Sequence, residues 1–195
     1  GGSLSMNILA LFISAMLINN IVLTKFLGMC PFMGVSTHLD SAIGMGAAVI
    51  FVIFGASVLS YFLYYFVLVP LNLEYMQLIT FILLIAAFVQ FVELFVKKFS
   101  PALYKQLGIY LPLITTNCTV LYVAQDNITQ GYTLVETMVN SIATPAGFML
   151  MLVIFATIRE RLNQNNVPKS FQGNPIAFVV AGIMAIAFSA LAGLV

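Results

Sequence analysis

The stretch SAIGMGAAVIFVIFGASVLSYFLYYFVLV, residues 41–69, decides the fold class, because it is apolar throughout and contains no charged residue. A helix needs roughly 20 such residues to cross the hydrocarbon core of a membrane. The whole chain is 62% hydrophobic and 7% charged, whereas soluble domains are about 45–50% apolar and about 25% charged. Its apolar runs also lack the in–out alternation of barrel strands. The sequence therefore predicts an all-α integral membrane protein.

Six segments are long and apolar enough to be predicted as membrane spans. They cover residues 6–29, 41–69, 76–96, 106–124, 133–158 and 175–195. Residues 1–5 are set aside as extra N-terminal residues, and residues 6–195 are expected to form a single six-helix membrane domain.

The basic residues predict the orientation of the chain. Six of the seven lie in two loops, 97–105 and 159–169, which are on the same side of the membrane if the spans alternate. An excess of Lys and Arg marks cytoplasmic loops, so both loops are expected in the cytoplasm and both termini outside. The net charge of +1 and the lack of a basic stripe argue against nucleic acid as a partner.

Three spans followed by three spans give halves of opposite orientation, about residues 6–98 and 99–195, which is the pattern of an inverted repeat. Each half contains one cysteine, Cys30 or Cys118, next to helix-breaking or polar residues. The identities between the halves are few, so the repeat is predicted from topology and from the paired cysteines.

The stretch LGMCPFMGV, residues 27–35, predicts an interruption in the first span. It contains Gly28, Pro31 and Gly34, which loosen or break helices. A continuous helix over residues 6–37 would be about 48 Å long, well over the ~30 Å core. An interruption of this span is therefore expected near Cys30.

The second half has a matching irregular stretch, in which Pro112 is followed by the polar residues Thr115, Thr116 and Asn117. Irregular backbone survives in lipid only where protein or a cavity shelters it. Both spans that carry a cysteine, the first and the fourth, are therefore expected to be interrupted and to face the protein interior.

Four interpretations of the two cysteines remain open from the residues alone. They could be small buried packing residues, or a disulfide, which needs Cα atoms about 4.4–6.8 Å apart. A zinc site would need more ligands than His38, the only histidine. A [2Fe–2S] cluster usually takes four thiolates, so this chain could supply only half of them.

Four stretches carry a resemblance to a known family. NNIVLTKFLGMCPFMGVS (19–36), LGIYLPLITTNC (107–118) and IRERL (158–162), followed by FQGNPIA (171–177), closely resemble the family of A-type subunits of the Rnf electron-transport complexes. The related family comprises the E-type subunits of the sodium-pumping NADH:quinone reductase. The resemblance covers essentially the whole chain from Met6, and CPFMGVS resembles the Rnf branch.

The resemblance implies six helices in an inverted repeat, in the cytoplasmic membrane of a prokaryote. It implies a homologous partner of opposite orientation, the E-type Rnf subunit, which supplies two further cysteines. Cys30 and Cys118 would then be ligands of a shared [2Fe–2S] cluster. Such complexes couple electron flow between ferredoxin and NAD to Na⁺ or H⁺ translocation, with flavins carried elsewhere, among the B-, C-, D- and G-type subunits.

Four neighbours of the cysteines are candidates for tuning that cluster: Thr116, Asn117, Gly28 and Lys25. Polar side chains and freed backbone N–H groups set the potential of a buried cluster. Lys25 is the only basic residue inside a predicted span, and it could offset charge at the cluster or snorkel to an interface. No dinucleotide-binding glycine motif is present, so no flavin or nicotinamide is expected on this chain.

Two rival functions use the same features. A small secondary transporter would also have an inverted repeat and broken helices, with a substrate site at Asn19, Asn20, Thr115 and Asn117. A structural scaffold protein would need neither cysteine. The cysteine pair favours the electron-transfer function.

Overall fold

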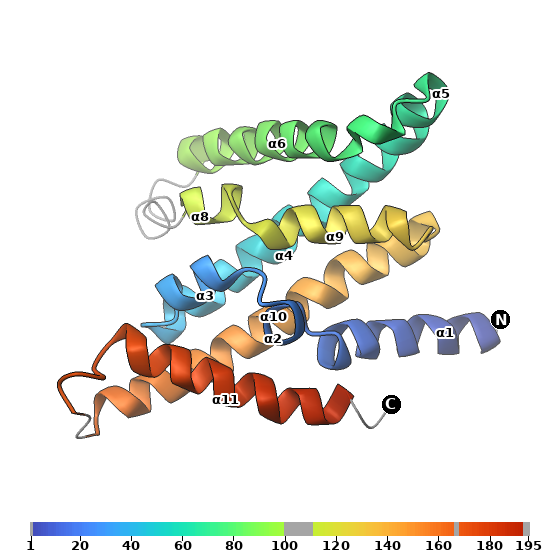
Figure 1. Cartoon of the computed structure of the whole chain (residues 1–195). Coiled ribbons are helices and arrows are strands. Elements are labelled where there is room, and N and C mark those ends of the chain that lie inside the picture. The colour runs from blue at the N-terminus through green and yellow to red at the C-terminus, as the bar shows by residue number, and fades with distance from the viewer. Residues whose placement is uncertain (1, 100–110, 166–167, 193–195) are drawn as a thin grey trace.

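The computed structural model describes residues 2–99, 111–165 and 168–192, and every regular element in these ranges is helical (Figure 1). The elements are α1 (Gly2–Ile13), η1 (Ser14–Ile18), α2 (Ile21–Lys25), α3 (Met29–Val35), α4 (Leu39–Leu63), η2 (Tyr64–Leu68), α5 (Val69–Leu71), η3 (Glu74–Met76), α6 (Gln77–Phe99), α8 (Leu111–Thr115), α9 (Cys118–Thr129), α10 (Leu134–Asn163) and α11 (Asn174–Ala192).

Within the described ranges, three helical stretches are long and apolar enough to cross a membrane: Leu39–Leu71, Glu74–Phe95 and Leu134–Asn163. They confirm the helices predicted over 41–69, 76–96 and 133–158. Shorter apolar helices cover Asn7–Ile18 and Asn174–Ala190. Residues 106–110 of the fourth predicted span, 193–195 of the sixth and Lys105 lie outside the described residues.

The helix that follows Thr133 is longer than predicted and extends through the expected loop residues Arg159 and Arg161. It begins with a capping box, in which the Glu136 carboxylate accepts hydrogen bonds from the Thr133 N–H and the Thr133 hydroxyl. Pro145 lies inside it without ending it. The predicted loop 159–169 therefore begins only after Asn163.

The first predicted span is interrupted, but not at Pro31 and Gly34. The backbone leaves the helix at Asn19–Asn20 and again at Phe26–Gly28, and α3 then runs through both residues. Pro31 lies in the first turn of α3, where its missing N–H would have no partner in any case. A proline in the first turn is compatible with the helix that follows and does not break it.

The core lies where α4 and α10 pack against each other, with α9 against α4 on one side. Glycines allow the close approach: a Cβ on Gly46 would lie 2.5 Å from Met149 Cγ, and one on Gly147 would lie 2.5 Å from the Met16 carbonyl oxygen. Small residues at helix contacts are the usual way in which membrane helices pack. These contacts fix α4 and the end of the first helix against α10.

Figure 1 shows which connections lie together. The start of α1, α5 and the α9–α10 turn lie at one end of the bundle, and α3, α8 and the end of α10 lie at the other. The interruptions between α2 and α3 and between α8 and α9 both lie between these ends. They are the part of the fold that carries the cysteines.

Candidate functional site

The first interruption is organised by Asn20. Its side-chain oxygen accepts the N–H of Val22 at 3.2 Å and so caps the start of α2. Its Nδ2 donates to the carbonyl oxygens of Met16, at 3.2 Å, and of Gly147, at 3.0 Å. This buried side chain therefore satisfies backbone groups on both sides of the break and ties the break to α10.

The second interruption is organised by Asn117 in the same way. Its side-chain oxygen accepts the N–H of Thr119 at 3.0 Å and caps α9. The backbone angles also agree: φ −62° and ψ 115° at Asn20, and φ −71° and ψ 114° at Asn117. One difference remains, because the buried Nδ2 of Asn117 has no hydrogen-bond partner in the described part of the chain.

The turn between α2 and α3 packs directly against the start of α9. Phe26 and Gly28 both have positive φ, 54° and 74°. Gly28 is required here, because a Cβ would lie 2.6 Å from Thr119 Oγ1 and 3.1 Å from Phe148 Cε2. The Gly28 N–H donates to the Cys118 sulfur at 3.1 Å.

This contact places Cys118 against the turn that leads into Cys30. Cys118 is the first residue of α9, and Cys30, the second residue of α3, follows Gly28 by two positions. The Cα atoms of Gly28 and Cys30 are therefore at most about 7.6 Å apart, since each step is about 3.8 Å. Both thiols are free and both are exposed on the chain's surface.

The arrangement can hold part of a metal centre but not all of one. Among the described residues, no group of three or more His, Cys, Asp or Glu side chains could hold a metal ion. His38 precedes α4, at the far end of α3 from Cys30. Two exposed thiols beside a backbone N–H donor fit a cluster whose other ligands come from a second chain.

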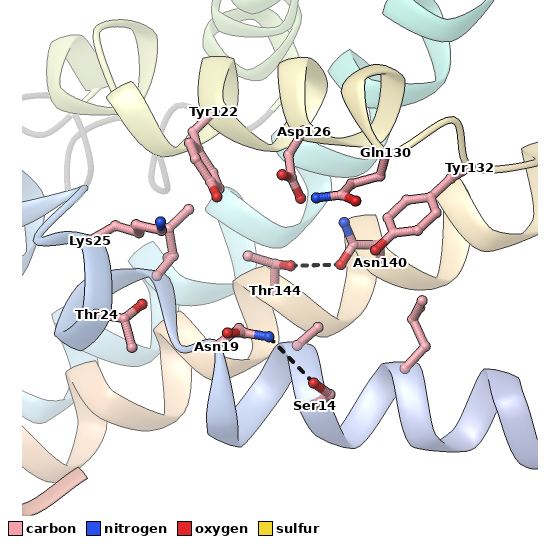
Figure 2. Close-up of a pocket in the computed structure, with 13 residues that line it drawn as sticks. Ser14, Asn19, Thr24, Lys25, Tyr122, Asp126, Gln130, Tyr132, Asn140 and Thr144 are labelled. Carbon is pink, nitrogen blue, oxygen red and sulfur yellow. Dashed lines mark hydrogen bonds between the residues drawn. The ribbon is translucent and has the colours of Figure 1, made fainter. Parts of the chain in front are cut away.

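The other predicted neighbours of the cysteines have different roles in the structure. The Thr116 hydroxyl donates to the Pro112 carbonyl oxygen at 2.8 Å, which bonds it to the preceding turn. The Lys25 side chain lines a separate polar cavity with Tyr122 and Asp126 (Figure 2). Gly28 contacts Cys118 directly, and Asn117 caps the helix that Cys118 begins.

Arg159 is a residue that sequence reasoning placed in a loop. It is 8% exposed, and its Nη1 donates to the Met33 carbonyl oxygen at 2.8 Å and to Ser36 Oγ at 2.9 Å. One turn away, the ring of Phe155 stacks on Phe32 with centroids 4.5 Å apart. Together these contacts attach α3 to α10.

Comparison with known proteins agrees with this architecture. Residues 8–195 match the model of a family described as "Rnf-Nqr subunit, membrane protein". The chain belongs to this family. Membership in the Rnf-Nqr family confirms the resemblance drawn from the four sequence stretches.

Relatives match the chain over almost its full length. It is 52% identical to the A-type subunit of the Na(+)-translocating ferredoxin:NAD(+) oxidoreductase complex of Acetobacterium woodii, over 97% of this chain and 98% of the relative. It is 52% identical to the A-type subunit of the ion-translocating oxidoreductase complex of Syntrophotalea carbinolica, with the same coverage. The corresponding protein from Serratia proteamaculans is 53% identical over 96% and 97% of the two chains.

Proposed function

We propose that this chain is the A-type membrane subunit of an ion-translocating ferredoxin:NAD⁺ oxidoreductase of the Rnf type. In this function it carries electrons across the membrane and is not a complete enzyme alone. The names of the full-length relatives support the assignment. The observation that carries the electron-transfer function is the Gly28–Cys118 hydrogen bond, which sets the Cys118 sulfur against the turn that precedes Cys30, with both thiols exposed.

The proposed ligands are Cys30 and Cys118, with two further cysteines from a homologous partner of opposite orientation, the E-type Rnf subunit. A [2Fe–2S] cluster, when bound, supplies a one-electron redox centre between the two membrane faces. In this chain, α3 and α9 present the thiolates, and the Gly28 N–H donates to one sulfur. Such donors stabilise negative charge on thiolate sulfur.

Two features support the proposed inverted repeat and orientation. Asn20 and Asn117 cap helices with similar backbone angles, and each organises an interruption in one half of the chain. The basic residues Lys97, Lys98, Arg161 and Lys169 lie in the two stretches proposed to face the cytoplasm. The B-, C-, D- and G-type subunits of the complex would hold the flavins and further clusters.

The test is iron and acid-labile sulfide analysis with EPR after reduction, on this chain purified together with its homologous partner. We expect an iron–sulfur signal that is lost in Cys30→Ser and in Cys118→Ser. His38→Ala is the control and keeps the signal, because His38 is not a proposed ligand. A full signal in both cysteine variants would show that the cysteines are packing residues and would favour a scaffold or transporter function.

A further inference from the structure

A second polar site lies beside the cysteine surface. A cavity of about 300 Å³ lies between the first interrupted helix, α9 and α10 (Figure 2). Its lining includes Lys25 at the end of α2, Asp126 on α9, Tyr132 in the α9–α10 turn, and Asn140 and Thr144 on α10. None of these residues belongs to the proposed cluster ligands. Ionisable side chains in a cavity of so apolar a chain indicate a functional site, such as one for a bound ion.

Asp126 gives the cavity a negative charge without a bonded partner. Its carboxylate is half-buried and makes no hydrogen bond or ion pair with any residue in the described ranges. It lies close enough to Tyr132 that it adds to the effect of burial in raising the pKa of that phenol. A half-buried carboxylate that lines a polar cavity attracts positive charge, so a cation from outside the chain would stabilise this arrangement.

Two lining residues, Asn140 and Thr144, begin a chain of hydrogen-bonded polar groups that continues behind the cavity. Thr144 Oγ1 donates to Asn140 Oδ1 at 3.1 Å, and Asn140 Nδ2 donates to Asn127 Oδ1 at 2.7 Å. Asn127 in turn donates to Ser141 Oγ at 3.2 Å. Thr144 lies about 15 Å along α10 from its first residue, at about 1.5 Å per residue. This length along α10 equals about half the thickness of a bilayer core.

We propose that this cavity binds a small monovalent cation, with Asp126 as its charged ligand and the oxygens of Asn140 and Thr144 as neutral ligands. The inference deepens the proposed function and rests on it, because it assigns a site to the ion that the complex would translocate. Sites for Ca²⁺ usually draw on several oxygen ligands, carboxylates among them. A single carboxylate with amide and hydroxyl oxygens fits a monovalent ion better.

Lys25 makes the site responsive to the cysteines. Its ammonium group lines the same cavity and is a tethered cation that competes electrostatically with a bound ion. The backbone of Lys25 leads within three residues to Gly28, whose N–H contacts Cys118. Negative charge added at the cysteine surface would draw the ammonium toward it and reduce its electrostatic competition with an ion at Asp126. Cation binding and reduction at the cysteines would then favour each other.

The experiment uses infrared difference spectroscopy on the purified complex, with Na⁺ added against a choline background. We expect a carboxylate band that titrates with Na⁺ and is absent in Asp126→Asn. Lys25→Met should keep the band and shift its midpoint to a Na⁺ concentration about tenfold lower, because a nearby positive charge is gone. Opposite effects in two variants cannot both come from misfolding.

Glu74→Gln is the matched control, because Glu74 is an exposed carboxylate outside the cavity lining. It should keep the Asp126 band and its midpoint. EPR on the same samples separates the two proposals. A Na⁺ band that persists in Asp126→Asn, or an unchanged midpoint in Lys25→Met, overturns the cation site even where the cluster signal is intact. A missing cluster signal in the unmodified complex overturns the proposed function instead.

Discussion

Gly28 is the residue on which the packing of the α2–α3 turn against Cys118 depends. It has a positive φ, leaves no room for a Cβ and donates its N–H to the Cys118 sulfur. Any side chain there must both strain the backbone and push the turn away from α9. The geometry of the cysteine pair therefore depends on the absence of a side chain.

Gly28→Ala should destabilise the protein by about 2 kcal/mol or more, because a left-handed backbone costs alanine about 1–2 kcal/mol before any clash. It should also reduce the iron content of the complex. Thermal unfolding and iron analysis of the purified complex measure both effects. Gly34→Ala is the control: Gly34 lies in α3, and among the described residues its Cβ would meet only Leu113, at 3.6 Å. Equal stability of the two variants would contradict this account.

Asn117 should influence the redox potential of the proposed cluster, because its Nδ2 is buried beside Cys118 and has no partner among the described residues. Asn117→Ser keeps a capping oxygen and removes this donor. The midpoint potential should fall by about 20–60 mV, the equivalent of one hydrogen bond of about 0.5–1.5 kcal/mol.

The control is Asn20→Ser at the matching cap. Asn20 Nδ2 is already bonded to the Met16 and Gly147 carbonyl oxygens, so this variant should lose stability without moving the potential. EPR-monitored redox titration measures the two potentials. An unchanged potential in Asn117→Ser would show that its amide does not reach the cluster.

At the scale of the elements, α3 is a short helix that depends on α10. Arg159 holds its C-terminal end through Met33 and Ser36, and Phe155 stacks on Phe32. A seven-residue helix has little stability of its own in water. The position of Cys30 is therefore set by residues distant in the sequence.

Arg159→Met should release the end of α3 while keeping much of the packing volume. Amide hydrogen exchange across residues 29–36 should become about tenfold faster or more, since bonds from a charged donor contribute about 1.5–3 kcal/mol. Mass spectrometry of the exchanging complex measures this. Arg161→Gln, an exposed neighbour on the same helix, should leave exchange in α3 unchanged. Equal exchange in both variants would exclude an anchoring role.

The long helices could be predicted because their apolar runs exceed what a membrane span needs. The interruptions were predicted, but their positions were partly wrong. Pro31 lies in the first turn of α3 and does not break it, and the break at Asn20 depends on the carbonyl oxygen of Gly147, far away in the sequence. The same limit applies to Arg159, whose partners lie on another element. Sequence patterns reveal local preferences, whereas these positions are decided by long-range contacts.

At the scale of the whole molecule, the distribution of charge predicts how the protein lies in its membrane. A membrane-impermeant maleimide added to intact cells should label Asn72→Cys, in the turn after α5, and not Lys169→Cys, between α10 and α11. The excess of basic residues near Lys169 predicts that this loop lies in the cytoplasm. Labelling of Lys169→Cys only after the cells are broken is the matched control. The reverse pattern would invert the proposed orientation.

The two exposed, free thiols also have a consequence for biogenesis. Under the proposed shared cluster, a newly inserted chain offers only half of a binding site. Iron and sulfide delivery must then wait until the homologous partner has been inserted alongside. Until that moment both sulfurs are open to oxidants, so the cell has a reason to synthesise the two proteins in equal amounts and to degrade unpaired copies. The cluster would mark completed assembly as well as carry electrons.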